Sequence, residues 1–157
     1  MSNSDLQKLH SLSSYFRRIN AKIKLLSLLN RAKLAYEQNN YSECLESCRN
    51  ILEDDFNNPI ALRAIGCVMQ SIGDNEKALE YYNKALNFSK NKEIEYTLIG
   101  TIYYNENDFE KAIEYYNMAI DVNDSYELAY DKRNQSMLEN HVHILDIQDE
   151  LIKRNLF

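Results

Sequence analysis

The chain has 157 residues, 45% of them hydrophobic and 27% charged, with only three glycines and one proline. Such a chain can bury a core as one domain, and the scarcity of helix breakers predicts an all-α protein. The net charge of −6 is uneven, because residues 1–33 hold seven Lys and Arg against one acid and leave −12 on the rest. This acidic body argues against nucleic acid as a partner, since phosphate binding needs a basic surface.

The three cysteines predict a reducing compartment. Their odd number does not make a disulfide framework, and we therefore expect a cytoplasmic protein. No apolar run approaches the roughly 18 residues of a membrane span, so a membrane is not expected as a partner. The N-terminus lacks the apolar core of a secretory signal, but it is rich in Ser and poor in acids, which leaves an organellar presequence open.

The first predicted element is a basic amphipathic helix over residues 1–24. Apolar residues follow one another at spacings of 3, 4, 3, 4 and 3, which is typical of a heptad seam. We expect this seam either to pack on the next helices or to form a homodimer through residues 9–26, and its basic charge leaves docking on an anionic surface open. The seam residues are Leu9, Leu12, Phe16, Ile19, Ile23 and Leu26.

The middle of the chain is an internal repeat with a period of 34 residues. The stretch EKALEYYNKAL begins at Glu76, and EKAIEYYNMAI begins 34 residues later at Glu110, with eight of eleven letters identical. This period predicts three units, over 25–58, 59–92 and 93–126, each with two helices around a short turn. Because one helix pair cannot cover its apolar face, successive pairs must stack. The predicted turns are Gln38-Asn39-Asn40, Gly73-Asp74-Asn75 and Glu106-Asn107-Asp108.

Small and aromatic residues recur within the period. The eighth place holds Ala32, Gly66 and Gly100, the twentieth holds Cys44, Ala78 and Ala112, and the twenty-fourth holds Cys48, Tyr82 and Tyr116. In this pattern the chain resembles tetratricopeptide repeat proteins. The resemblance implies an all-α, right-handed α-solenoid of three helix-turn-helix repeats, with an N-terminal helix and a C-terminal capping region over 127–157. Within that last region, Asn140-His141 is a candidate break between two helices.

The resemblance also implies a function through the concave groove that the first helices of the repeats line. In this family the groove can hold acidic chaperone tails through a dicarboxylate clamp, but the clamp positions here read Leu29, Lys33, Ala64, Ile94 and Leu98, so the clamp is absent. We expect a peptide with apolar anchors instead, and we expect substitution of Arg63 and Tyr104 to weaken its binding without unfolding the chain. The predicted groove residues are Lys33, Tyr36, Arg63, Cys67, Gln70, Thr97, Thr101 and Tyr104.

No motif predicts catalysis or a cofactor. Cys44 and Cys48 have a spacing that could hold a metal, but they occupy core places of the repeat, where cysteine acts as a small hydrophobe. The residues His141 and His143 are expected at a solvated helix end. Tyr82 and Tyr116 fall in the core rather than on a stacking platform for nucleic acid.

The sequence therefore predicts a non-enzymatic protein-binding module, acting as an adaptor, scaffold or chaperone-like protein. A bacterial secretion chaperone is a narrower form of this prediction. The alternative is an assembly or structural protein that acts through homodimerisation of the N-terminal helix or through docking on a membrane surface.

Overall fold

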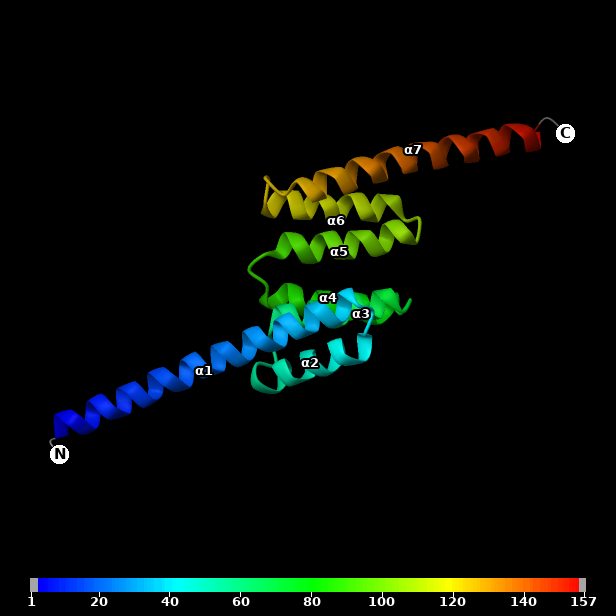
Figure 1. Cartoon of the computed structure of the whole chain (residues 1–157). Helices are drawn as coiled ribbons and strands as arrows, with labels where there is room; N and C mark the ends of the chain where they lie inside the picture. The colour runs from blue at the N-terminus through cyan, green and yellow to red at the C-terminus, as the bar shows by residue number, and fades with distance from the viewer. Residues whose placement is uncertain (1–2, 156–157) are drawn as a thin grey trace.

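The computed structural model describes residues 3–155, and this part of the chain forms seven α-helices and no strand (Figure 1). The scarcity of Gly and Pro thus has the predicted consequence. In chain order the helices are α1 (Asn3–Glu37), α2 (Tyr41–Asp54), α3 (Pro59–Ser71), α4 (Asn75–Phe88), α5 (Lys92–Asn105), α6 (Phe109–Val122) and α7 (Glu127–Asn155).

The helices pack as three successive pairs followed by a capping helix. The pairs are α1 with α2, α3 with α4, and α5 with α6, and α7 packs against both α6 and α5. Contacts of α2 with α3 and of α4 with α5 join one pair to the next, so that the pairs stack into an α-helical solenoid (Figure 1). The predicted all-α repeat solenoid is confirmed.

One turn geometry connects the two helices of each pair. A residue with a left-handed backbone (Asn39, Gly73 or Asn107, with φ of 57°, 85° and 62°) precedes the capping residue of the second helix. The caps are Asn40, Asp74 and Asp108, and each side chain accepts a hydrogen bond from the backbone N–H three residues later. Asn and Gly tolerate the left-handed conformation better than other residues, which explains why the predicted turns lie where they do.

The core of the second and third repeats is built on a glycine against a tyrosine. Tyr82 and Tyr116 are fully buried, and a Cβ atom at Gly66 would lie only 2.5 Å from Cε1 of Tyr82. At Gly100 the corresponding distance to Cε1 of Tyr116 is 2.7 Å. The small residues of the repeat are therefore needed for close packing at the helix crossing, since any side chain there would overlap a buried ring.

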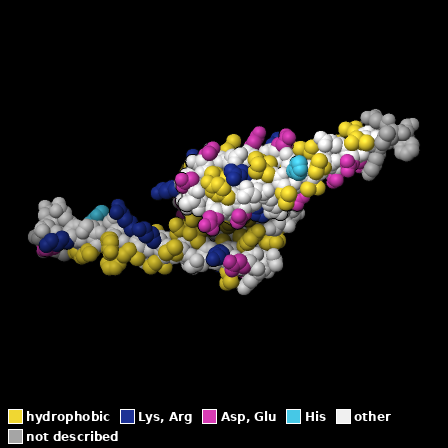
Figure 2. Space-filling view, turned by 90° about the horizontal axis from the view of Figure 1, so that it is seen from above, with side chains coloured by type: hydrophobic (Ala, Val, Ile, Leu, Met, Phe, Trp, Pro, Cys, Tyr) yellow, Lys and Arg dark blue, Asp and Glu magenta, His cyan; other side chains and the backbone are white. Residues whose placement is uncertain are grey.

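The two terminal helices extend beyond the stacked pairs. Helix α1 runs without a break across the predicted boundary at residues 24/25, and its first half leaves the body in the opposite direction to the end of α7 (Figures 1 and 2). The seam residues Leu9, Leu12, Phe16 and Ile23 are more than half exposed, so the seam does not pack on the first repeat.

The predicted break at Asn140-His141 is wrong, because α7 is one helix from Glu127 to Asn155. Asn and His have modest helix propensity, but only Pro or Gly would break a helix strongly, and neither occurs in this stretch. The two histidines consequently lie within a helix rather than at its end, and the ring of His143 contacts that of Phe109.

Candidate functional site

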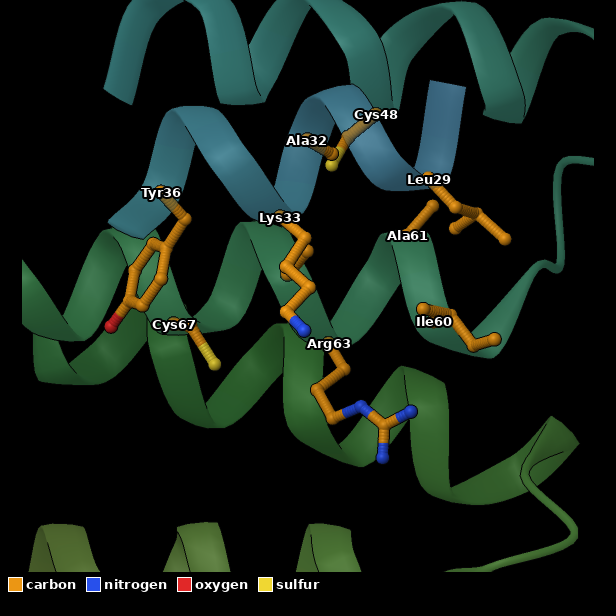
Figure 3. Close-up of a pocket in the computed structure, with 10 residues that line it drawn as sticks. Leu29, Ala32, Lys33, Tyr36, Cys48, Ile60, Ala61, Arg63 and Cys67 are labelled. Atoms are coloured by element: carbon orange, nitrogen blue, oxygen red, sulfur yellow. The ribbon is translucent and has the colours of Figure 1, made fainter. Parts of the chain in front are cut away.

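A cavity of about 200 Å³ lies between α1 and α3, with one residue of α2 at its lining. Its walls are mainly apolar, and two cations stand beside them. Figure 3 shows Lys33 and Arg63 extending in the same direction from α1 and α3, with Ile60 and Leu29 to one side of them and Tyr36 to the other. Four of the eight predicted groove residues, Lys33, Tyr36, Arg63 and Cys67, thus line one cavity.

The cavity is associated with a small residue in a place that is aromatic in the other repeats. Cys48 lines the cavity, whereas the equivalent residues of the next two repeats are Tyr82 and Tyr116. The Tyr82 hydroxyl donates to Oε1 of Gln70 at 2.8 Å and approaches Sγ of Cys67 at 3.4 Å. These two partners are the equivalents, one repeat later, of Tyr36 and Lys33. A tyrosine at position 48 would therefore occupy the space that the cavity leaves open.

The side chains of Lys33 and Tyr36, both on α1, keep their polar ends accessible. Lys33 is 73% exposed, and its Nζ lies 3.8 Å from Oε1 of Glu37, one helical turn away. Tyr36 shares a hydrogen bond of 3.0 Å with the hydroxyl of Ser71. Because such exposed ion pairs are weak, Lys33 can readily exchange Glu37 for an acid of a ligand.

Arg63, in contrast, is already engaged inside the protein. Its Nη1 lies 3.4 Å from Oε1 of Glu95 on α5, a side chain that is fully buried, and the Arg63 side chain itself is only 19% exposed. Neither carboxylate oxygen of Glu95 has a hydrogen bond within the described chain. The guanidinium is therefore the ion-pair partner of a buried carboxylate, so its substitution is expected to destabilise the fold. This geometry contradicts our expectation that Arg63 could be replaced without structural cost.

The remaining four predicted groove residues make internal contacts. Gln70 accepts the Tyr82 hydroxyl, and the buried Thr97 donates to the backbone carbonyl of Glu93. Thr101 accepts from the Tyr116 hydroxyl at 3.3 Å. The Tyr104 hydroxyl accepts from Nε2 of Gln135 on α7 at 2.9 Å. None of these four lines the cavity.

A polar contact zone, here named the α3–α5 junction, replaces the cavity between the second and third repeats. It is the Arg63–Glu95 ion pair. Also on α5, the buried Glu93 accepts at Oε1 from Nδ2 of Asn123, the residue after α6, at 3.1 Å. Sequence reasoning missed Glu95, because an acid near a helix start is ordinarily an exposed residue that complements the helix dipole. It also missed Cys48 as a cavity residue, although the repeat alignment shows a small residue there in place of a tyrosine.

The three cysteines have the character of core thiols. Cys44 and Cys48 are fully buried, and burial raises the pKa of the Cys48 thiol to about 12. Burial also raises the pKa values of Cys44 and Cys67. Among the side chains that the structure describes, no group of three His, Cys, Asp or Glu residues could hold a metal ion.

The family comparison identifies two of the repeats directly. Tetratricopeptide repeat models match residues 64–92 and 94–126, which correspond to the second and third helix pairs. None of the curated proteins matches the sequence. Within the described part of the chain, no helix is both long and apolar enough to cross a membrane.

Solved structures share the fold at low sequence identity. A Thermobaculum terrenum O-GlcNAc transferase matches with a TM-score of 0.66 and 16% identity over 74% of this chain, which spans only 22% of that enzyme. The first tetratricopeptide repeat domain of Spaghetti (RPAP3), bound to the HSP90 peptide SRMEEVD, matches with a TM-score of 0.63 and 16% identity over 73% of this chain and 91% of that one. A MamA structure matches with a TM-score of 0.62 and 16% identity over 100% of this chain and 99% of that one.

Taken together, the stacked helix pairs, the capped left-handed turns and the two family matches define an α-helical repeat protein. The chain is a tetratricopeptide repeat protein. This fold is a protein–protein interaction module, and some of the neighbouring domains bind peptides of partner proteins.

Proposed function

We propose that the protein is a non-enzymatic interaction module that binds a peptide segment of another protein and seats one apolar side chain in the cavity between α1 and α3. The observation that carries this proposal is the small Cys48 in the place that Tyr82 and Tyr116 fill in the other repeats. In this role the protein would act in the cytoplasm as an adaptor, scaffold or chaperone-like protein.

The cavity chemistry defines the kind of peptide. Its apolar lining suits a side chain such as Leu, Ile or Phe, and burying one contributes about 1.5–3 kcal/mol. Lys33 stands beside the cavity and would pair with an acidic residue next to the anchor. Arg63 contributes less to recognition, because Glu95 already neutralises its charge.

An acidic chaperone tail is a poorer ligand for this surface. The RPAP3 domain holds the peptide SRMEEVD, whose last residues include three acids. In the present chain, the family's clamp positions hold the apolar Leu29, Ile94 and Leu98. We therefore favour an apolar anchor with a single neighbouring acid over a tail with several carboxylates.

The test converts the first repeat to the pattern of the other two. The double variant Ala32→Gly, Cys48→Tyr would fill the cavity with a ring packed against a glycine, while the cavity rim stays unchanged. Peptides selected from a random library on the wild-type chain should bind this variant at least about tenfold more weakly, since the anchor loses its burial. Binding is measured by fluorescence anisotropy and folding by urea denaturation.

A matched control is Phe56→Ala, which removes an exposed apolar ring from the loop after α2, outside the cavity. It should leave peptide affinity unchanged. Equal affinity of the selected peptides for the wild type and the filled variant would show that the cavity is not the binding site.

A second role is favoured by the exposed seam of α1. Leu9, Leu12, Phe16 and Ile23 have no cover within the chain, and we propose that this helix acts in assembly, through self-association or docking on a membrane surface. If the helix mediates self-association, a chain that begins near Leu25 should no longer self-associate in light scattering. Co-sedimentation with vesicles tests docking on a membrane surface.

A further inference from the structure

We infer that the protein assembles head to tail, with the projecting half of α1 in one copy packed in parallel on the projecting half of α7 in the next. This inference rests on the proposed self-association through α1 and names its counterpart. The two surfaces are defined here as the α1 extension, residues 3–24, and the α7 extension, residues 137–152. Neither contributes a residue to the cavity.

Both extensions are exposed helices with an uncovered apolar seam. In the α1 extension no described residue is buried, and in α7 the last buried residue is Ser136. At the usual rise of ~1.5 Å per residue, the α1 extension is about 33 Å long and the α7 extension about 24 Å. Beyond Ser136, five residues of α7 follow one another at spacings of 4, 3, 4 and 3. Four of them are apolar, and the fourth in order is Asp149. The α7 seam consists of Leu138, Val142, Leu145, Asp149 and Ile152.

The charges of the two extensions are opposite. Residues 3–24 hold five cations and one acid, giving +4, whereas residues 137–152 hold four acids and no Lys or Arg, giving −4. Figure 2 shows hydrophobic side chains along one edge of the α1 extension and Lys or Arg along the other. Two α1 extensions would bring like charges together, while an α1 and an α7 extension attract each other.

The positions of these charges match a parallel pair of helices. With the α1 seam at the a and d places of a heptad, Lys8 and Lys22 fall at g, beside the seam. With the α7 seam at the same places, Glu139 and Asp146 fall at e. In a parallel pair, g residues of one helix meet e residues of the other. Two cations of α7, Lys153 and Arg154, follow the extension directly, and Arg154 pairs with Glu150.

The arrangement in space allows this pairing between copies but not within one. Figures 1 and 2 show the extensions leaving the body in opposite directions, while both helices run in the same general sense along the chain. Moving one copy along this direction brings its α1 extension beside the α7 extension of the copy before it, in parallel. Such an interface joins two different surfaces, so repetition produces an open chain or a ring.

A membrane would cover only the α1 extension. An anionic bilayer attracts the basic residues and accepts the apolar seam, but it would repel the acidic α7 extension and leave that second seam uncovered. A second copy covers both seams in one contact. The observations therefore favour a second copy.

The experiment uses the full chain and two charge reversals. One variant is Lys8→Glu, Lys22→Glu and the other is Glu139→Lys, Asp146→Lys, all at exposed side chains whose replacement leaves the core intact. In sedimentation velocity over a concentration series, the wild type should associate increasingly with concentration, and less so at high salt. Each reversal should weaken this association about tenfold or more, because two attractions become repulsions.

Mixing the two variants provides the decisive measurement. The reversed α1 of one variant then meets the reversed α7 of the other, and the unchanged α7 of the first meets the unchanged α1 of the second. Both contacts again join opposite charges, so association should return to the wild-type level. Matched controls with the same change in charge are Lys90→Glu, Lys92→Glu, on the loop before α5 and at its first residue, and Glu114→Lys, Asp121→Lys on α6. Both controls should associate as the wild type does.

The contrary results separate the two proposals. If the α1 reversal weakens association and the α7 reversal leaves it unchanged, the α7 counterpart is wrong and self-association through α1 stands. If the wild type stays monomeric at every concentration, both fail. In that case, binding to vesicles of phosphatidylcholine with phosphatidylserine, lost in the α1 reversal alone, would assign the seam to a membrane surface.

Discussion

The cavity and the α3–α5 junction occupy successive places in one repeat array, yet one is apolar and open and the other is polar and filled. Beside the cavity, Cys48 is small and Lys33 extends into solvent. At the junction, Arg63 reaches across to the buried Glu95. The same fold thus produces both a surface that can accept a ligand side chain and a surface that is closed by its own ion pair. Residue size and internal partners decide which of the two results.

The largest effect should come from breaking the junction. Arg63→Ala leaves Glu95 buried without its ion-pair partner, and we expect the free energy of unfolding to fall by about 3–5 kcal/mol. Replacing both partners, with Arg63→Met and Glu95→Leu, should recover most of this loss, because no unpaired charge remains. Urea denaturation measures both variants. A full loss in the double variant would show that the ion pair is not what stabilises the junction.

The glycine–tyrosine contact gives the next largest effect and separates the first repeat from the second. Gly66→Val places a branched side chain against the ring of Tyr82, and we expect a loss of about 1–3 kcal/mol. In a Tyr82→Cys background, which imitates the first repeat, the same substitution should cost much less. The control is Ala32→Gly, which should change stability by about 1 kcal/mol or less, because only helix propensity changes. Additive losses in Gly66→Val and Tyr82→Cys would contradict the contact.

The repeat pattern predicted the fold because its signals are local. The left-handed turns at Asn39, Gly73 and Asn107 and the small residues at the helix crossings each depend on a few neighbouring residues. The predicted core role of Tyr82 is confirmed, because its side chain is fully buried. The predicted break at Asn140 is wrong, because the weak preference of Asn against a helix does not interrupt α7 without a Gly or Pro.

The candidate site could be predicted only in part, because its character depends on partners far apart in the sequence. The register, that is, the place of each residue within the 34-residue repeat, predicted that Lys33, Tyr36, Arg63 and Cys67 lie on one surface. It could not reveal the pairing of Arg63 with an acid 32 residues later. It likewise missed Gln135, which donates to Tyr104 from the last helix. Long-range contacts between side chains depend on how helices are packed, whereas the register depends only on spacing.

Alkaline pH should weaken the core beneath the cavity. The pKa of Cys48 is about 12 in the folded chain, against about 8.5 for an unfolded thiol. A group with a raised folded pKa binds its proton more tightly when folded, so its contribution to stability is complete below pH ~8.5 and declines as the pH rises toward 12. The free energy of unfolding should therefore fall between pH ~8.5 and 11, and less steeply in Cys48→Ala.

A parallel slope in the wild type and in Cys48→Ala would assign the decline to other groups. Tyr82 is a candidate, because burial raises its pKa as well. Tyr82→Phe provides the matched control, since it keeps the ring and removes only the titrating hydroxyl.

The smallest effect should come from Lys33, on the open side of the comparison. Its side chain is largely exposed and its contact with Glu37 is long, so Lys33→Ala should change the free energy of unfolding by less than about 0.5 kcal/mol. Loss of a pairing with an acidic peptide residue should weaken binding about two- to fivefold, in a manner that high salt abolishes. Anisotropy titrations at low and high salt measure this difference. Lys33→Arg keeps the charge and should bind nearly as the wild type does, whereas a salt-independent loss in Lys33→Ala would mean that the lysine acts through its aliphatic stem, as a wall of the cavity.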